Sequence, residues 1–107
     1  MFCYHHTMAF YTYIMACASN TAIYIGVTGN ILQRVAQHKT GAGGVHTAKY
    51  RIRKLVYVEV HAELAQAIAR EAKLKRWPRE WKNQLIAEAN PMWHDLTMDT
   101  SFLLNSD

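Results

Sequence analysis

Residues 24–39 read Tyr-Ile-Gly-Val-Thr-Gly-Asn-Ile-Leu-Gln-Arg-Val-Ala-Gln-His-Lys, and this stretch decides the fold. Its beginning, Ala22 to Val27, is apolar, β-branched and aromatic, which predicts a strand. Thr28-Gly29-Asn30 predicts a turn whose side-chain oxygens can cap a helix. From Asn30 to Lys39 the apolar residues recur at helical spacing, which predicts a short helix. Arg34 and His38 are four residues apart, so they lie side by side along one edge of that helix.

A second strand is predicted upstream, at Phe10 to Cys17, and residues 18–21 can turn it back as a hairpin. Such a hairpin can place the hydroxyls of Tyr13 and Tyr24 on one face. A strand tyrosine is most often a packing residue, so a chemical role needs support from the rest of the site.

The remainder of the chain predicts one more strand and two more helices. Residues 40–44 are rich in glycine and end the first helix, and a flexible loop follows at residues 45–54. The later elements are a strand at residues 54–60, a long helix at 62–77 that Pro78 ends, and a shorter helix at 79–89. We assign residues 1–9 to an N-terminal extension, 10–96 to the domain and 97–107 to a C-terminal tail.

Composition and charge indicate a small basic domain. The chain has 107 residues, a net charge of +4 and no run near the ~20 apolar residues of a membrane-spanning helix. All 12 Lys and Arg residues lie within residues 34–82, where only four Glu oppose them. Such a distribution favours a polyanionic partner, although a solvated charged face is an ordinary alternative. Cys3 and Cys17 do not have the spacing of a zinc site and are interpreted as reduced thiols of a cytoplasmic protein.

Glu71 is the residue that stands out on chemical grounds. It and Lys75 fall in the middle of an apolar arc on the long helix, which comprises Leu64, Ala65, Ala67, Ile68, Ala72 and Leu74. A carboxylate in such a place costs several kcal/mol unless it is paired or bound to a metal. The two interpretations are therefore a Glu71–Lys75 ion pair and a metal ligand.

The order of motifs resembles the GIY-YIG nuclease superfamily, specifically its small stand-alone members. The two signature triplets correspond to Thr12-Tyr13-Ile14 and Tyr24-Ile25-Gly26. Arg34 lies ten residues after Tyr24. The likeness continues through five further segments: 54–59, 68–71, 74–77, 81–82 and 90–96. Thr12 stands where the first signature glycine is expected, and its larger side chain is a candidate obstacle to substrate access.

The resemblance implies an α+β fold with a three-stranded, mainly antiparallel sheet flanked by helices. It implies catalytic roles for Tyr13, Tyr24 and Arg34, with His38 in support, and a metal-binding role for Glu71. We expect Tyr13 to activate the attacking water and Tyr24 to assist. Residues expected to contact nucleic acid are Lys39, His46, Lys49, Tyr50, Arg51, Arg53 and Asn90. Trp77, Trp81 and Trp93 are interpreted as packing residues and not as a platform for bases.

The resulting hypothesis is an endonuclease that hydrolyses DNA phosphodiester bonds with one Mg²⁺ or Mn²⁺, in DNA repair or processing. The alternatives are a catalytically weak or inactive nucleic-acid-binding module and a purely structural interaction domain. Branched, flapped, duplex and single-stranded DNA all remain open as substrates, as does RNA, and no membrane partner is expected. The oligomeric state is undetermined.

Overall fold

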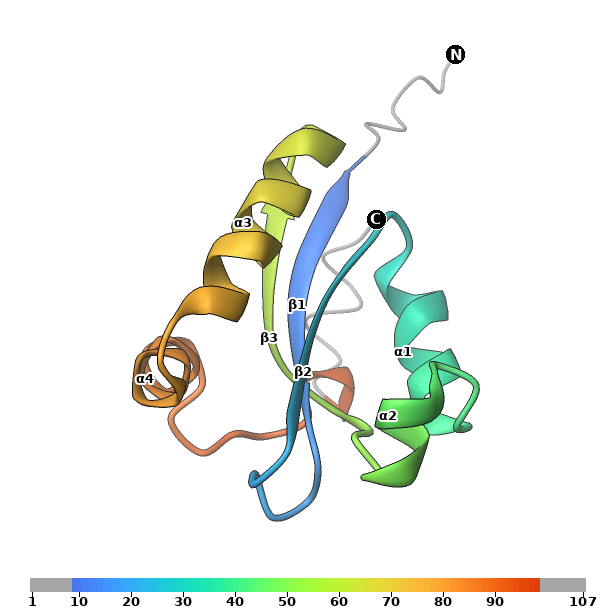
Figure 1. The fold of residues 1–107 in the computed structure, drawn as a ribbon. Coiled ribbons are helices and arrows are strands. Elements are labelled where there is room, and N and C mark those ends of the chain that lie inside the picture. The colour runs from blue at the N-terminus through green and yellow to red at the C-terminus, as the bar shows by residue number, and fades with distance from the viewer. Residues whose placement is uncertain (1–8, 99–107) are drawn as a thin grey trace.

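Three antiparallel strands form the centre of the structure, a computed structural model that describes residues 9–98 (Figure 1). They are β1 (Phe10–Ala16), β2 (Ile23–Thr28) and β3 (Lys54–His61), in the order β2-β1-β3. β1 and β2 form the expected hairpin, in which Tyr13 pairs with Gly26. The predicted α+β fold and its antiparallel sheet are confirmed.

The two faces of the sheet carry different helices (Figure 1). Because side chains alternate along a strand, Tyr13 and Met15 pack on one face, with Ile31 and Val35 of α1 (Ile31–Lys39). The intervening Ile14 faces α3 (Leu64–Arg76) and α4 (Arg79–Ala89) in a second cluster. The sheet is therefore the middle layer between two apolar cores, and its two signature tyrosines belong to the α1 face.

The segment that we expected to be a flexible loop contains a helix. α2 (Val45–Lys49) begins directly after Gly44 and buries Thr47, whose hydroxyl donates to the Gly44 carbonyl at 3.2 Å. Ile52, a few residues later, is also fully buried. A helix of one turn is unstable alone, so tertiary packing produces α2, and local sequence does not reveal it.

The side of α3 that meets the sheet is narrower than the predicted apolar arc. Only Ala67 and Leu74 are buried, whereas Leu64 and Ile68 are exposed. Glu71 lies between the two buried residues on the same stripe, four positions after one and three before the other. The carboxylate therefore does face inward, although the arc used to predict this was wrong in part.

Thr12 connects the sheet to α3 and does not obstruct the tyrosines. Its side chain is fully buried and its hydroxyl donates to the carbonyl of Ala67 at 2.9 Å. It is next to Tyr13 in β1, so it points to the opposite face of the sheet. The concern that Thr12 narrows access to the tyrosines is therefore not supported.

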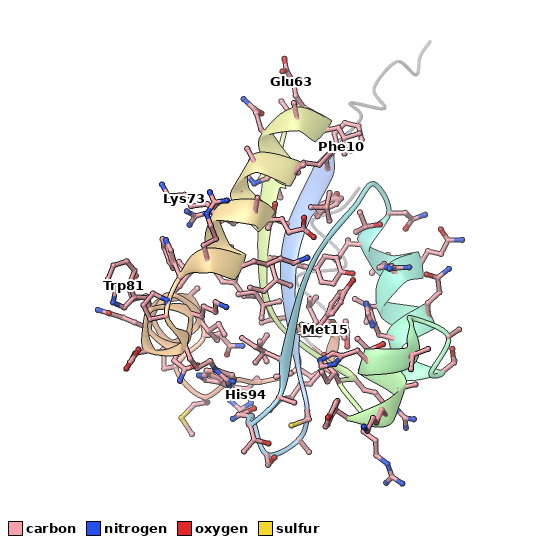
Figure 2. The ribbon with its side chains drawn as sticks, in the orientation of Figure 1. Phe10, Met15, Glu63, Lys73, Trp81 and His94 are labelled. Atoms are coloured by element: carbon pink, nitrogen blue, oxygen red, sulfur yellow. The ribbon has the colours of Figure 1, made fainter. Side chains whose placement is uncertain are left out.

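The tryptophans differ in their surroundings. Trp77 and Trp93 pack against the α3–α4 core, as predicted. Trp81 is 56% exposed, so its interpretation as a packing residue was wrong. Figure 2 shows its side chain projecting outward from α4.

The chain after α4 is held against the sheet by Asp95, just before a short 3₁₀ turn, η2 (Leu96–Met98). The carboxylate of Asp95 accepts hydrogen bonds from the Leu55 amide, the Thr97 hydroxyl and amide, and the Lys39 ammonium. Burial alone would raise the pKa of Asp95, but the bonds from Lys39 and Thr97 outweigh it and lower this pKa below its usual value. Among residues 9–98, no helix has the length and apolar character to cross a membrane.

We expect Asp95→Asn to lower the free energy of unfolding at pH 7 by ~1–3 kcal/mol, the range for hydrogen bonds to a charged group. Since the folded-state pKa is depressed, the stabilisation is complete above the unfolded value of ~3.9 and is lost as pH falls through the folded value. Urea unfolding at pH 7 and in acid measures both effects. Glu88→Gln is the control because that carboxylate is exposed. Equal stability of Asp95→Asn and wild type at pH 7 would contradict the assignment.

Candidate active site

The Tyr13 hydroxyl is the meeting point of the predicted catalytic residues. Arg34 donates to it from Nε at 3.2 Å, and His38 Nε2 lies 3.1 Å from it. Tyr13 is 0% exposed, and His38 is equally buried. The helical spacing predicted for Arg34 and His38 therefore places both beside one phenolic oxygen.

Tyr24 lies beside this group on the neighbouring strand. Its ring centroid is 6.3 Å from that of Tyr13 and 5.2 Å from that of His38. Unlike Tyr13, Tyr24 is only partly buried. Tyr24 is thus the tyrosine with access to solvent, a difference that hairpin pairing alone does not predict.

Two glycines make room for this packing. A Cβ at Gly26 would lie 2.6 Å from the Tyr13 hydroxyl and 2.9 Å from Tyr24 Cε2. A Cβ at Gly43 would lie 2.5 Å from Nδ1 of His38. Gly26 belongs to the signature triplet, but the sequence contained no signal that Gly43 packs against the histidine.

Burial and the Arg34 charge together set the protonation of the group. Burial raises the pKa of Tyr13, although the hydrogen bond from Arg34 opposes this rise. Burial and then the neighbouring Arg34 charge lower the pKa of His38, so its imidazole is neutral at pH 7. No residue within 9–98 pairs with its Nδ1 atom. The hydrogen bond to Tyr13 raises the pKa of Arg34, which stays charged.

The Arg34 guanidinium is held at two of its nitrogens. In addition to the Nε bond to Tyr13, Nη1 donates to Gln37 Oε1 at 3.0 Å. Gln37 was not identified from the sequence, although its position three residues after Arg34 on a helix could have indicated the contact. Two fixed nitrogens orient the planar group and reduce the freedom lost when it binds an anion.

Glu71 reaches the same region from α3. Its side chain is 23% exposed, and its negative charge contributes to the raised pKa of Tyr13. Oε2 lies 3.2 Å from the ammonium of Lys75, which is 53% exposed, so the ion pair considered from sequence is present. An exposed pair of this kind contributes little stability, which leaves the carboxylate available to another cation.

The fit of Glu71 to a divalent ion can be judged from its donor atoms. Mg²⁺ prefers oxygen ligands, keeps several waters and is commonly bound through one or two carboxylates together with substrate phosphates. Glu71 offers one partly exposed carboxylate, and the described residues contain no group of three His, Cys, Asp or Glu side chains arranged for a metal. A hydrated ion completed by substrate fits this arrangement, whereas an ion enclosed by protein ligands does not.

The residues predicted to contact nucleic acid separate into two groups. The exposed group lies on and after α2 and comprises His46, Lys49, Tyr50, Arg51 and Arg53. The rings of His46 and Tyr50 are 5.0 Å apart, and the Lys49 ammonium lies 5.3 Å from the Tyr50 ring centroid. These side chains form one basic and aromatic surface, as predicted.

Lys39 and Asn90 have structural partners instead. Lys39 is paired with Asp95 and donates to the Arg53 carbonyl at 3.0 Å. Asn90 is buried, donates to the Val56 and His94 carbonyls, and accepts from the His94 amide. Both N–H donors and the oxygen of the Asn90 side chain are engaged within the protein, so the structure does not support a nucleic-acid contact there.

Lys54 is a basic residue that sequence reasoning missed. With Lys39, Arg51, Arg53 and Asp95 it lines an open cavity of ≈ 340 Å³ where β3 begins. Its ammonium donates to Asn20 Oδ1 at 2.7 Å. The basic surface therefore extends from α2 to the start of β3.

Comparisons with known proteins give matches over most of the chain. Residues 9–84 match the model of the GIY-YIG catalytic domain. The UPF0213 protein SH2523 of Staphylococcus haemolyticus is 36% identical over 78 residues, covering 73% of this chain and 94% of that protein. A UPF0213 protein of Syntrophus aciditrophicus is 39% identical over 82 residues, covering 76% and 92%. The solution structure of the UPF0213 protein BH0048 from Bacillus halodurans has a TM-score of 0.54 at 26% identity, covering 84% of this chain and 95% of that one.

We expect Gly26→Ala to destabilise the protein by ~1–3 kcal/mol, because the added methyl would overlap Tyr13 and Tyr24. Gly29→Ala is the matched control, since its Cβ would lie 3.7 Å from the Phe10 ring, an ordinary contact. Urea unfolding of both variants measures the difference. If the two substitutions prove equally mild, the tyrosines do not depend on Gly26.

Proposed function

This chain belongs to the family of the GIY-YIG catalytic domain, and on that premise we propose that it is a divalent-metal-dependent DNA endonuclease. The family indicates a nuclease. The observation that carries the proposal is the hydrogen-bonded group of Arg34, Tyr13 and His38, next to the partly exposed Tyr24. A fixed cation beside a phenol and a neutral imidazole suits the hydrolysis of a phosphodiester.

Arg34 binds the scissile phosphate. Its guanidinium is oriented by Tyr13 and Gln37, and the hydrogen bond with Tyr13 raises its pKa, so it is charged at neutral pH. Donors that are already in place when charge develops on the phosphoryl oxygens lower the barrier more than mobile ones. Arg34 thus supplies charge stabilisation without reorganising.

Tyr24 contacts the attacking water, and Tyr13 positions the other groups. A general base must lie within ~3 Å of the proton that it removes. The Tyr13 hydroxyl is fully buried and already bonded to Arg34 and His38, so it is poorly placed for this contact. The burial of Tyr13 therefore favours the reverse of the expected order, in which Tyr24 acts in its phenolate form and takes the proton from the attacking water.

His38 holds Tyr13 in place as a neutral hydrogen-bonding partner. Its buried ring cannot reach the substrate, and its lowered pKa keeps a second positive charge away from Arg34. Glu71 would hold a hydrated Mg²⁺ or Mn²⁺, which when bound supplies positive charge to the phosphate and the leaving oxygen. Lys75 is the natural counter-ion of Glu71 when no metal is present.

The basic surface on α2 provides affinity for the DNA backbone. Lys49, Arg51 and Arg53 are exposed and lie in the same segment as the paired His46 and Tyr50 rings. Cations in such a place neutralise phosphates without reading sequence, which implies weak and salt-sensitive binding. Low sequence specificity follows, and the site of cleavage depends on the shape of the DNA.

A catalytically inactive binding module is the second candidate. It is favoured by one observation, the Glu71–Lys75 ion pair, which occupies the proposed metal ligand. Both candidates use the basic surface, but only the enzyme requires Glu71 to exchange its lysine partner for a metal ion.

We expect Glu71→Gln to abolish cleavage of labelled DNA in Mg²⁺ or Mn²⁺ while DNA affinity and unfolding free energy stay close to wild type. The change keeps the shape of the side chain and removes its charge, and the lysine partner that it leaves is exposed to solvent. Glu63→Gln, on an exposed residue of the same chain, is the control for cleavage. Undiminished cleavage by Glu71→Gln would refute the metal role, and a wild type that binds but never cleaves would favour the binding module.

We expect Tyr24→Phe to slow single-turnover cleavage at saturating Mn²⁺ by at least ~10²-fold, the lower end for general acid–base catalysis. Tyr13→Phe should slow it less and lower the free energy of unfolding, because it leaves His38 and Arg34 without a buried partner. Cleavage rates and urea unfolding of both variants give the comparison. A larger rate loss for Tyr13→Phe, with stability unchanged, would restore Tyr13 as the base.

A further inference from the structure

Trp77 and Trp81 form an exposed aromatic corner between α3 and α4. Their ring centroids are 5.8 Å apart with an interplanar angle of 75°, so the two indoles are in a T-shaped, edge-to-face arrangement. Trp81 is 56% exposed. Trp77 packs against the α3–α4 core, so it supports Trp81, whose exposed ring can stack on a ligand.

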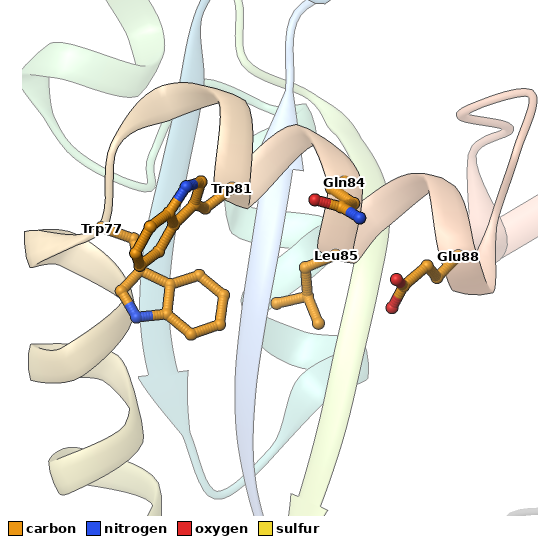
Figure 3. Close-up of a pocket in the computed structure, with 5 residues that line it drawn as sticks. All are labelled: Trp77, Trp81, Gln84, Leu85 and Glu88. Carbon is orange, nitrogen blue, oxygen red and sulfur yellow. The ribbon is translucent and has the colours of Figure 1, made fainter.

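The corner opens into a shallow cavity of ≈ 280 Å³ (Figure 3). The two indoles lie at one end, Leu85 lies in the middle, and Gln84 and Glu88 supply polar groups at the rim. The volume is just below the ~300–1,000 Å³ of pockets for drug-sized ligands. The cavity is therefore suited to one planar ring system with hydrogen-bonding groups at its edge, and not to a whole cofactor.

The charges around the corner indicate that the ring system bound there belongs to a polyanion. Residues 70–82 contain six Lys and Arg but only two Glu. Four of the cations are engaged: Arg70 by Glu59 and the Trp77 ring, Lys75 by Glu71, Arg79 by the Asn20 and Thr21 carbonyls, and Lys82 by the Lys75 carbonyl. Lys73 and Arg76 are exposed, and Figure 2 shows Lys73 projecting on the same side of the molecule as Trp81.

α3 links this corner to the proposed catalytic site. Glu71 and Trp77 are six residues apart, which is ~9 Å along the helix axis and about a third of a turn around it. Consecutive phosphates of a strand are ~3.4 Å apart along a duplex axis. A DNA strand that leaves Glu71 and crosses α3 obliquely therefore reaches the tryptophans within a few nucleotides.

We propose that the Trp77–Trp81 corner stacks an unpaired base of the DNA substrate, with Lys73 and Arg76 contacting its phosphates. The site rests on the proposed nuclease function and defines its substrate class as DNA with a single-stranded segment next to the cleaved bond. A paired base cannot enter, because its faces are covered by its neighbours and its edge is engaged. Gln84 and Glu88 then contact the edge of the stacked base.

The test measures binding without cleavage. Fluorescence anisotropy in EDTA compares a duplex carrying a short single-stranded overhang with a blunt duplex of the same sequence. We expect the wild type to bind the overhang substrate about tenfold more tightly, since stacking one base contributes ~1–3 kcal/mol. Trp81→Ala should remove this preference without weakening blunt-duplex binding, and Trp81→Phe should keep most of it.

Met92→Ala is the control, because it also removes an exposed apolar side chain but lies outside the cavity. A second variant, Glu88→Gln, should change the order of binding affinities among overhangs made of dA, dC or dT. It should leave the affinity for the blunt duplex unchanged. A Trp81→Ala protein that keeps the overhang preference would overturn the proposal. So would sedimentation showing that Trp81 mediates association of two copies of the chain.

The same measurements separate this inference from the proposed function. Because they are made in EDTA, a protein that never cleaves DNA can still show the overhang preference. Conversely, metal-dependent cleavage with no overhang preference would leave the nuclease intact and refute the stacking site.

Discussion

The hydrogen bonding of the Tyr13 hydroxyl is the interaction on which the rest of the site depends. This one oxygen is fully buried and joins β1 to two residues of α1, Arg34 and His38. An unsatisfied buried hydroxyl or imidazole would cost ~1–3 kcal/mol, so each group stabilises the position of the others. The absence of a side chain at Gly26 is what allows the oxygen to lie there.

The two faces of the sheet carry different parts of the structure. Its α1 face holds the tyrosines, the arginine and the histidine, while its other face packs against α3 and α4. Thr12 belongs to the second face, where its hydroxyl bonds to α3 one turn before Glu71. Thr12 thus helps to fix α3, which carries Glu71. The next residue, Tyr13, orients the Arg34 guanidinium on the α1 face of the sheet.

In the proposed nuclease, affinity and chemistry use different residues for a physical reason. The Arg34 guanidinium is restrained by two partners, which favours a single geometry at the phosphate. The cations of the α2 surface are exposed, and such charges attract a polyanion over a distance without fixing its position. Lys39 shows that a basic residue is not always available to a ligand, since it pairs with Asp95 and so helps to hold the segment around Asp95 against the sheet.

The amino-acid sequence by itself determined the strands of the hairpin, the helix that follows and the family, because these depend on local periodicity and on motifs in a fixed order. It also predicted on which side of their helices Arg34, His38 and Glu71 lie, because helical spacing decides which side chains are neighbours; their chemical roles stay predictions. Only the tertiary structure decided which tyrosine is buried, that Asn90 is a structural amide and that Trp81 is exposed. Those outcomes depend on contacts between residues far apart in the chain, which leave no local pattern: the Asn90 amide bonds to Val56, and Tyr13 to a helix 25 residues later.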